Sequence, residues 1–344
     1  MICFSWIGFP QYAARCIRAL VHSTNEEICV IATTPSVPIK GMDEIASCKV
    51  FWVSEDDNRS ITEIIGEVPR VFFACGWGTP FINRLRDEVR SENKIVAVTC
   101  DNNFVLGYKL ILQYFRFKLF FRNKYNAFFV PGNSGRRLMR FYGISQDKIF
   151  KGLYSADGSI FESRMHLPER PKRILYVGQF CDRKNVLMLC KAFLELPLDV
   201  RSGWKLELCG NGPLREHLPI DQDIIVHDFV QPEELSKIYQ RSRIFVLPSK
   251  EEHWGLVVHE AALSGCYLIL GEEVGAREDL LQEDINGVLV DPHNKSDLSV
   301  KLVAAMSLSS DRLHTAEKKS IELAKKISVE NFVKSVKAIS LSNS

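Results

Sequence analysis

Two glutamates flank the start of one apolar helix in the second half of the chain. Glu252 lies in a polar loop after an apolar run that ends at Pro248, and Glu260 follows within a predicted helix over Leu256–Ser264. The free N–H groups and positive dipole end of such a helix suit a diphosphate, and Gly255 would let a ligand approach the backbone. Carboxylates on both sides of this point could accept hydrogen bonds from sugar hydroxyls. The pattern therefore predicts a site for a phosphorylated polyol.

Each glutamate taken alone has a simpler explanation. Glu252 could be a solvated loop residue, and Glu260 could pair with a basic neighbour. The segment as a whole argues against this, because further motifs lie in order around it. Upstream, Leu175–Phe180 places a glycine after a strand and Arg183-Lys184-Asn185 follows it, while Gly210-Asn211-Gly212-Pro213 ends the next strand.

The elements that must position these residues alternate between strand and helix, as in a doubly wound α/β domain. In the first half, short apolar runs predict strands at Ile2–Ile7, Ile28–Ala32, Lys49–Val53, Arg70–Cys75, Lys94–Thr99 and Ala127–Val130. Helical patterns lie between most of these runs, as at Tyr12–His22 and Thr79–Ser91.

The second half repeats this alternation after Asp157–Arg173, where glycine, prolines and charges predict a linker. Strands are predicted at Arg173–Gly178, Lys205–Gly210, Asp223–His227, Ile244–Pro248, Tyr267–Leu270 and Gly287–Val290. Helices are predicted at Lys184–Leu196, Glu233–Arg241, Leu256–Ser264 and Arg277–Leu281. The tail from Lys295 to Ser342 has a helical pattern that breaks near Ser307–Ser310.

A chain of 344 residues exceeds the size of most single cores, so two domains are expected. We expect residues 1–165 to form one Rossmann-like domain, residues 166–325 a second, and residues 326–344 a helix able to return to the first. The fold class is α/β, with two doubly wound domains facing across a cleft. Loops at the carboxyl ends of the strands would line that cleft. This architecture suits an enzyme or a binding protein equally.

The segment Pro248–Ala261 resembles the Glu-x7-Glu signature of the retaining glycosyltransferases of the GT-B fold, family 4. The resemblance continues through Ala261–Cys266, Gly275, Glu278–Leu281 and Asn286–Val290. It includes the upstream glycine motifs and Pro232-Glu233-Glu234-Leu235, so it covers roughly residues 170–307. In the N-terminal half only the alternation of strands and helices matches.

The resemblance implies a role for each matching residue. Lys184 would neutralise the diphosphate of a nucleotide-sugar donor, and N–H groups at Leu256 and Val257 would hold the distal phosphate. Glu260 would bind the ribose hydroxyls and Glu252 those of the donor sugar. The donor site would also include Gly8, Gly178, Gln179, Arg183, Gly210, Phe229, Trp254 and Gly255. The catalytic set would be Glu252, Lys184 and Asp101.

The sequence departs from the family pattern at several of these positions. The usual arginine after the strand's glycine is Gln179, so Arg183 would have to supply the second positive charge. Asp228 replaces the glycine of the turn that contacts the nucleobase, so the resemblance does not indicate which nucleobase the donor carries. The N-terminal double glycine is reduced to Gly8. Asp101 occupies the region of a family histidine, where it would orient the acceptor hydroxyl or cap the next helix.

Composition indicates where in the cell the protein is located. The ten cysteines are scattered, lack a CxxC pair and often lie in apolar runs, which predicts reduced thiols and a cytoplasmic location. No apolar run reaches the ~18 residues of a membrane span, and the N-terminus does not resemble a signal peptide. The histidines and acids predict no metal site, and no cofactor is expected beyond the donor substrate. We therefore expect a cytoplasmic protein, attached at most to the inner face of the cell membrane.

The stretch 107–140 is basic and aromatic, and no acidic residue lies between Asp101 and Asp147. Its basic residues are Lys109, Arg116, Lys118, Arg122, Lys124, Arg136, Arg137 and Arg140. One interpretation is an anionic membrane surface as partner, and the other is a half-buried domain helix whose basic side chains reach water. No nucleic-acid-binding module is recognisable, and no nucleic-acid partner is expected.

These observations predict a retaining, metal-independent glycosyltransferase. Its acceptor would be a saccharide, lipid-linked, in cell-surface polysaccharide or lipopolysaccharide biosynthesis. One alternative is a nucleotide-sugar-binding protein or scaffold with little turnover, which Gln179 keeps open. Another is a nucleotide-sugar epimerase, which would need acid–base residues that the sequence does not show around the sugar.

Overall fold

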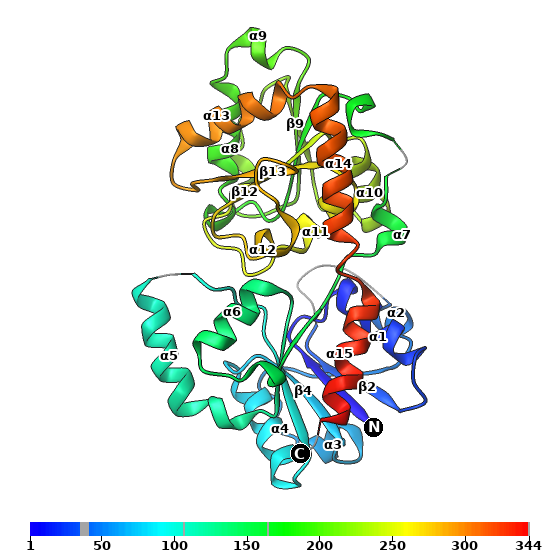
Figure 1. Cartoon of the computed structure of the whole chain (residues 1–344). Coiled ribbons are helices and arrows are strands. Elements are labelled where there is room, and N and C mark those ends of the chain that lie inside the picture. The colour runs from blue at the N-terminus through cyan, green and yellow to red at the C-terminus, as the bar shows by residue number, and fades with distance from the viewer. Residues whose placement is uncertain (35–40, 106, 164, 343–344) are drawn as a thin grey trace. The chain divides into compact units, whose positions relative to one another are not determined.

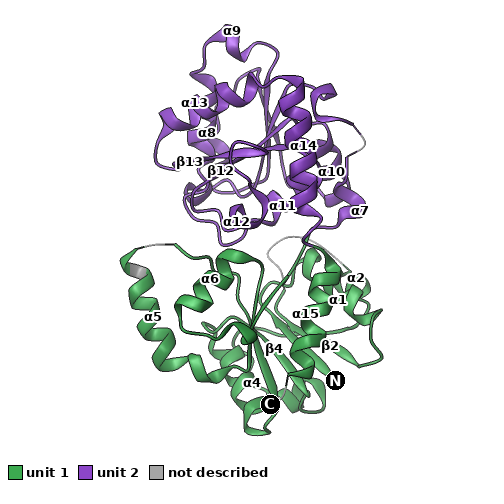
Figure 2. Cartoon of the chain, viewed as in Figure 1, with its two compact units in different colours: residues 1–155, 328–344 green, residues 156–327 purple. Residues whose placement is uncertain are grey.

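The computed structural model describes residues 1–34, 41–105, 107–163 and 165–342, which form two compact units (Figure 2). Unit 1 comprises residues 1–155 and 328–344, and unit 2 comprises residues 156–327. Residues 156–165, which the sequence analysis assigned to the first domain, thus belong to unit 2. Residues 326 and 327, expected in the final helix, also belong to unit 2.

Unit 1 is built on a parallel sheet whose order, among the described residues, is β3-β2-β1-β4-β5-β6-β7. Its strands are β1 (Ile2–Trp6), β2 (Ile28–Ala32), β3 (Lys49–Trp52), β4 (Val71–Cys75), β5 (Ile95–Thr99), β6 (Ala127–Val130) and β7 (Ile149–Lys151). Every residue of β1, β2 and β5 is buried, because helices cover both faces of a doubly wound sheet. Strand β7 was not predicted, since its three residues are too few to show a pattern.

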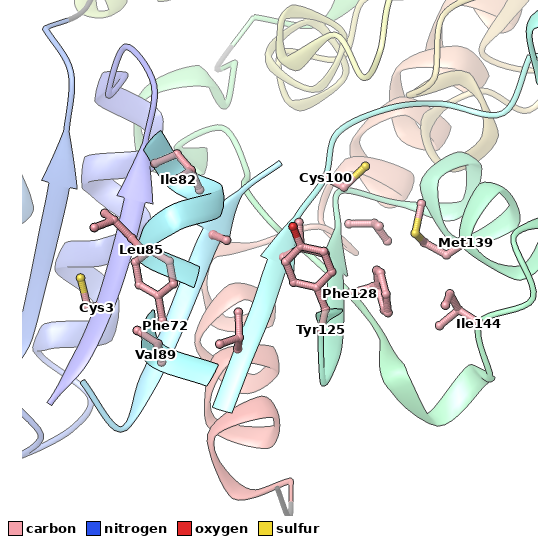
Figure 3. Packing of buried hydrophobic residues seen from close by; sticks show 14 of the residues in the cluster. Cys3, Phe72, Ile82, Leu85, Val89, Cys100, Tyr125, Phe128, Met139 and Ile144 are labelled. Atoms are coloured by element: carbon pink, nitrogen blue, oxygen red, sulfur yellow. The ribbon is translucent and has the colours of Figure 1, made fainter. Parts of the chain in front are cut away.

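The helices of unit 1 enclose this sheet (Figure 1). They are α1 (Gln11–Val21), α2 (Met42–Ala46), α3 (Ile61–Ile65), α4 (Pro80–Ser91), α5 (Tyr108–Phe120), α6 (Asn133–Phe141) and α15 (Val329–Leu341), with 3-10 turns η1 (Arg122–Lys124) and η2 (Gln146–Lys148). Figure 3 shows one core of the unit, where Phe72 and Phe128 from the sheet pack among side chains of the α4 and α6 region, including Leu85 and Met139.

The last helix, α15, packs against α1 and the sheet of unit 1 although it lies at the other end of the chain. Phe332 is fully buried, and its ring lies 5.9 Å from Phe4 and 5.4 Å from Phe129. Arg70 of the unit donates to the Ser340 carbonyl at 2.7 Å. The core of unit 1 is therefore completed by the C-terminal residues.

Unit 2 repeats the architecture with the described strand order β10-β9-β8-β11-β12-β13. The strands are β8 (Arg173–Val177), β9 (Lys205–Cys209), β10 (Ile224–His227), β11 (Ile244–Leu247), β12 (Tyr267–Gly271) and β13 (Gly287–Val290). In each unit the chain order reverses direction beside the first strand, as in a Rossmann-like sheet. The predicted class of two Rossmann-like α/β domains is confirmed.

The helical elements of unit 2 are α7 (Gly158–Phe161), η3 (Leu167–Glu169), η4 (Asp182–Lys184), α8 (Val186–Leu194), α9 (Leu198–Arg201), η5 (Arg215–His217), α10 (Pro232–Gln240), α11 (Leu256–Leu263), α12 (Arg277–Leu280), α13 (Lys295–Met306) and α14 (Ser310–Ala324).

The predicted linker Asp157–Arg173 is instead part of unit 2. It contains α7 and η3, and Leu167 and Arg170 are fully buried. The Arg170 guanidinium donates to the Ser242 and Ser264 carbonyls at 3.0 and 2.6 Å. Charge and proline content suggested a solvated linker, but long-range hydrogen bonds satisfy the buried charge. Arg164 of this segment lies outside the described residues.

Candidate functional site

The loops that carry Glu252 and the basic residues lie together at the switch point of the unit 2 sheet. Strands β8 and β11 are hydrogen-bonded neighbours there, and the connections to the rest of the sheet leave them in opposite directions. The loop after β8 carries Gly178 to Asn185, and the loop after β11 carries Pro248 to Gly255. Ligands bind at this position in open α/β sheets, because two loops diverge and leave a crevice.

Hydrogen bonds to backbone carbonyls join these two loops directly. The Arg183 guanidinium donates to the Glu251 carbonyl at 2.8 Å, and the Lys250 N–H donates to the Arg183 carbonyl at 2.9 Å. Asn185 is buried, has a left-handed φ of 62°, and donates to the Pro248 carbonyl at 3.1 Å. Its tolerance of positive φ turns the chain into α8. The sequence analysis gave Asn185 no role, although an asparagine directly before an apolar helix is a signal for such a turn.

Lys184 and Glu252 form an ion pair at the meeting point of the loops. Their side chains are only 11% and 12% exposed, so water screens the pair weakly. Glu252 is held from its other side, because it forms a β-bridge with Val274 and its carbonyl accepts from the Gly275 N–H at 3.0 Å. The two residues that the sequence placed in one site are thus brought together and oriented.

Helix α11 begins directly beyond this pair. Gly255 is its N-cap and has φ of 90°, and a Cβ there would lie 3.1 Å from the Glu252 Cγ. A glycine is therefore required by both the backbone angle and the close approach. Leu256 and Val257 follow in the first turn, where their N–H groups have no acceptor within the helix. This helix start has the geometry of an anion site beside a lysine.

Trp254 lies under this helix start. Its side chain is 2% exposed, and its carbonyl accepts from the Ala276 N–H at 2.9 Å. Its ring nitrogen is buried without a partner among the described residues. A donor contact predicted for Trp254 would therefore involve its backbone, because the indole ring faces the protein interior.

Glu260 lies further along α11 and is oriented by a tyrosine that the sequence analysis missed. The Tyr239 hydroxyl donates to a Glu260 carboxylate oxygen at 2.9 Å. Tyr239 is fully buried, and this burial, with the neighbouring Glu260 charge, raises the pKa of its hydroxyl well above the usual value. Tyr239 therefore stays a proton donor at physiological pH and fixes the Glu260 carboxylate. No pattern within α10 marks this contact, which arises from packing between helices.

The remaining predicted donor residues of unit 2 lie in the loop after β8 or directly after β9 and β10. Gly178 and Gly210 end β8 and β9, and a Cβ on Gly210 would lie 2.0 Å from the Gly178 carbonyl oxygen. Gln179 and Arg183 are exposed, and Phe229 after β10 is 45% exposed. Gly210 is thus explained by close backbone packing, whereas Gln179, Arg183 and Phe229 are accessible to a ligand.

Gly8 and Asp101 lie in unit 1, at the carboxyl ends of β1 and β5. Gly8 has a left-handed φ of 61°, and its N–H donates to the Thr33 hydroxyl at 2.8 Å. Asp101 is exposed. The Tyr12 hydroxyl is buried, and this burial, together with the negative charge of Asp101, raises the pKa of the hydroxyl above its ordinary value. Asp101 does not cap the next helix, because the N-cap of α5 is Gly107. The capping alternative is therefore wrong.

Comparison with known sequences finds similarities to the second half of the chain. Residues 160–322 match the family model "Glycosyl transferases group 1". An uncharacterized glycosyltransferase of Methanocaldococcus jannaschii is 26% identical over 146 residues, which cover 40% of this chain and 37% of the relative. A D-inositol 3-phosphate glycosyltransferase of Xylanimonas cellulosilytica is 27% identical over 178 residues, covering 46% and 42%. The chain therefore spans less than half the length of these curated relatives.

Comparison with solved structures extends over both units. The crystal structure of HepE from Anabaena in complex with UDP superposes with a TM-score of 0.74, covering 98% of each chain at 12% identity. At this identity the similarity concerns the fold alone. The family match and the switch-point geometry coincide in one region, since every residue of the site in unit 2 lies within the matched range. The candidate site of unit 2 thus lies in the part of the chain that is similar to the glycosyl transferases group 1 family.

Proposed function

We propose that the chain is a retaining, metal-independent glycosyltransferase that moves a sugar from a nucleoside diphosphate donor to a saccharide acceptor. One observation carries this proposal: a lysine–glutamate pair lies beside a helix start at the switch point of a group 1 domain. A cation and free N–H groups suit a diphosphate, and carboxylates suit sugar hydroxyls. The two kinds of group occur within one pair of loops.

The donor would lie with its diphosphate between Lys184 and the first turn of α11. The Lys184 ammonium has three N–H donors, so it can contact a phosphate oxygen while keeping Glu252 as a partner. Glu260, with one oxygen held by Tyr239, would accept from the ribose hydroxyls. Glu252 would accept from hydroxyls of the sugar. Phe229 is exposed at the strand end where a base would be contacted.

The chemical step that this site supports is a front-face displacement. The bond between the anomeric carbon and the leaving phosphate oxygen breaks, and the acceptor oxygen bonds to that carbon on the same face. The acceptor proton passes to the leaving phosphate oxygen. Lys184 and the α11 N–H groups stabilise the charge that develops on the diphosphate, which is the largest expected contribution to the rate. Asp101 would orient the acceptor hydroxyl.

The acceptor would bind unit 1. A cavity of about 120 Å³ there is lined by the residues Trp77, Asn102, Gln113, Arg116, Phe117, Phe121 and Tyr142. Aromatic faces and amide groups suit a sugar ring, whose carbons are apolar and whose hydroxyls both donate and accept. Gln113, Arg116 and Phe117 of α5 form part of its lining, so a saccharide held there would contact that helix.

Helix α5 supports the choice of a lipid-linked acceptor. Its buried side includes Leu110 and Phe117, whereas five large apolar residues on the other side are more than half exposed. At about 100° per residue these five fall within an arc of roughly 100°. They are Tyr108, Ile111, Leu112, Phe115 and Leu119. We call this set the α5 face. The interpretation of α5 as a half-buried domain helix thus suits one side of the helix, and the interpretation as a membrane-surface helix suits the other.

The charge around the α5 face suits anionic lipid. Arg116 and Lys118 flank it on either side, and Arg122 and Lys124 follow at its end, all exposed. The side chain of Lys109 lies outside the described residues. Basic residues beside an apolar face bind a bilayer surface by insertion and charge. No helix in the described part of the chain has the length and apolar character needed to cross a bilayer. We place the protein on the cytoplasmic face of a membrane, in cell-surface glycan synthesis.

Vesicle sedimentation tests the membrane component. The wild-type chain should sediment with vesicles of phosphatidylcholine and phosphatidylglycerol. The variant Leu112→Ser, Phe115→Ser, Leu119→Ser should bind at least about tenfold more weakly, because each inserted side chain contributes about 1.5–3 kcal/mol. Exposed Ile220 in unit 2 offers a matched control, Ile220→Ser. The charge variant Lys118→Glu, Arg122→Glu, Lys124→Glu should also lose binding. Unchanged sedimentation of both variants would contradict this component.

Release of nucleoside diphosphate tests the transfer itself. The purified chain is incubated with a panel of uridine, guanosine, adenosine and thymidine diphosphate sugars, with and without membrane-extracted glycolipids. Release that depends on the glycolipid supports transfer. Tight binding without release favours the alternative of a nucleotide-sugar-binding scaffold, which the uncharged Gln179 beside the loops keeps in view. Conversion of the sugar without release would favour an epimerase.

A further inference from the structure

A second cluster of chemically active side chains lies in unit 2, away from the donor loops. His166 directly precedes η3, and His314 and Glu317 lie on one side of α14. The Glu317 Oε2 atom lies 3.3 Å from the His166 Nδ1 and 3.8 Å from the His314 Nδ1. One ligand atom from each residue lies within 4.8 Å of the other two. Two ring nitrogens therefore converge on one carboxylate oxygen.

These separations are close to those of a metal's ligands. Zinc binds histidine nitrogen and carboxylate oxygen at about 2.0–2.2 Å in tetrahedral geometry, which sets neighbouring ligand atoms about 3.3–3.5 Å apart. The observed nitrogen–oxygen separations of 3.3 and 3.8 Å are close to this spacing, and all three ligand atoms lie within 4.8 Å of one another. Two histidines and one glutamate form a ligand set that zinc uses when a fourth position is left to water.

The glutamate of the cluster is held in a fixed orientation. The side chain of Glu317 is 8% exposed, and its other oxygen, Oε1, accepts from the Leu167 N–H at 3.1 Å and the Arg170 guanidinium at 3.4 Å. Arg170 is itself fixed by buried carbonyls. Oε2 is therefore the oxygen left facing the histidines. Such outer contacts fix the orientation of a ligand.

The histidines supply the accessible side of the cluster. The side chain of His166 is 66% exposed and that of His314 is 44% exposed. A cation can therefore enter from solvent and keep a water ligand. Because His166 and His314 lie far apart in the sequence, their pattern did not suggest a metal site.

We propose that His166, His314 and Glu317 bind a divalent transition-metal ion of the zinc class, with solvent in the remaining position. The ion ties the segment before β8 to α14 within unit 2. It lies at the far end of α11 from the donor loops, because the Glu317 Cγ packs against Gly265, just beyond the end of that helix. The site is thus separate from the catalytic site and is not required for the proposed transfer chemistry.

Titration of the untagged, chelator-treated full chain with Co²⁺ and Zn²⁺ tests this site. Tetrahedral Co²⁺ absorbs visible light strongly, so the spectrum reports coordination, and Zn²⁺ competition gives its affinity. The variants are His166→Gln and His314→Gln, whose exposed positions spare the core. Glu317 is left intact because it holds Arg170. The control is His217→Gln, another exposed histidine of unit 2.

The wild-type chain and His217→Gln should bind one equivalent and show the tetrahedral spectrum. Each ligand variant should bind at least about 100-fold more weakly, since even outer contacts contribute 10–100-fold to metal affinity. Absence of binding by the wild type, or binding by both ligand variants as tight as that of the wild type, would overturn the proposal. This readout needs no donor or acceptor, so either result leaves the proposed transfer activity to its own test.

Discussion

At the scale of single residues, the site depends on charges that are paired before any ligand arrives. Lys184 and Glu252 neutralise each other in a largely buried position, and Tyr239 orients Glu260. Burying such groups costs free energy unless partners are fixed, and fixed partners reduce the rearrangement needed on binding. The site is therefore preorganised by contacts within unit 2.

Removing the Lys184 charge tests its role in stabilising the leaving group. Lys184→Met should lower the turnover rate about 10²–10³-fold, because one stabilising donor of the transition state is lost. Lys250→Met is the matched control, since Lys250 lies in the adjoining loop and pairs with exposed Asp182 at 2.8 Å. Steady-state release of nucleoside diphosphate measures both. Equal effects of the two substitutions would argue against a specific role for Lys184.

A buried histidine on α11 predicts a pH dependence of stability. His259 accepts from the Ala156 N–H at 3.0 Å, its other nitrogen lies 3.0 Å from the Ala324 carbonyl, and burial lowers its pKa to about 4. Between pH 6.5 and 4, His259 is protonated in the unfolded chain but stays neutral in the folded chain. The free energy of unfolding should therefore fall by about 3 kcal/mol as pH decreases across this range.

Urea denaturation at pH 7, 6, 5 and 4 measures this slope. His259→Asn should be less stable at pH 7 but should lose the part of the slope due to His259. His217→Asn, which changes an exposed histidine, should keep the wild-type slope. A wild-type slope retained in His259→Asn would show that other groups cause it.

The sequence predicted the residues of this site better than their contacts. Lys184, Glu252, Gly255 and Glu260 were predicted, because short motifs place them on loops and a helix start. Asn185 and Tyr239 were missed, because their roles come from hydrogen bonds to other elements. Trp254 was predicted as a donor contact, but its ring is buried. Sequence patterns give residue type and spacing, whereas side-chain direction depends on tertiary packing.

At the scale of elements, close approach at strand ends shapes the loops. A Cβ on Gly210 would overlap the Gly178 carbonyl oxygen, so Gly210→Ala should destabilise unit 2 by about 1–3 kcal/mol or more. Gly158→Ala is the control, because a Cβ there meets only an ordinary contact at 3.9 Å. Thermal unfolding of both variants measures the difference. Equal melting temperatures would refute the close approach.

Elements with a strong period were predictable and short ones were not. Apart from β7, the described strands of both sheets were predicted within a residue or two, because buried parallel strands are continuously apolar. The prediction of a linker at Asp157–Arg173 was wrong, because Arg170 in this segment forms buried hydrogen bonds with distant elements. The two sides of α5 could not be separated from the sequence, since both are apolar and only packing decides which is buried.

At the scale of the whole molecule, the chain ends complete one folding unit. Phe332→Ala should destabilise unit 1 by about 3–5 kcal/mol, because the ring packs between Phe4 and Phe129. Leu341→Ala, on the same helix but 81% exposed, should have little effect. Hydrogen exchange should accelerate in β1 and β4 and stay unchanged in β8 and β11. Equal acceleration in both units would contradict this division.

Calorimetric titration of nucleoside diphosphate into Glu260→Ala and Glu252→Ala tests the central claim most directly, using the nucleotide that the donor panel selects. Glu260→Ala should weaken binding about 10–100-fold, since hydrogen bonds to a charged group contribute about 1.5–3 kcal/mol. Glu252→Ala should bind the bare nucleotide at least as well as the wild type, because it frees Lys184, yet should lose turnover. If both variants bound the nucleotide equally and kept turnover, the assignment of the donor site to these two glutamates would be wrong.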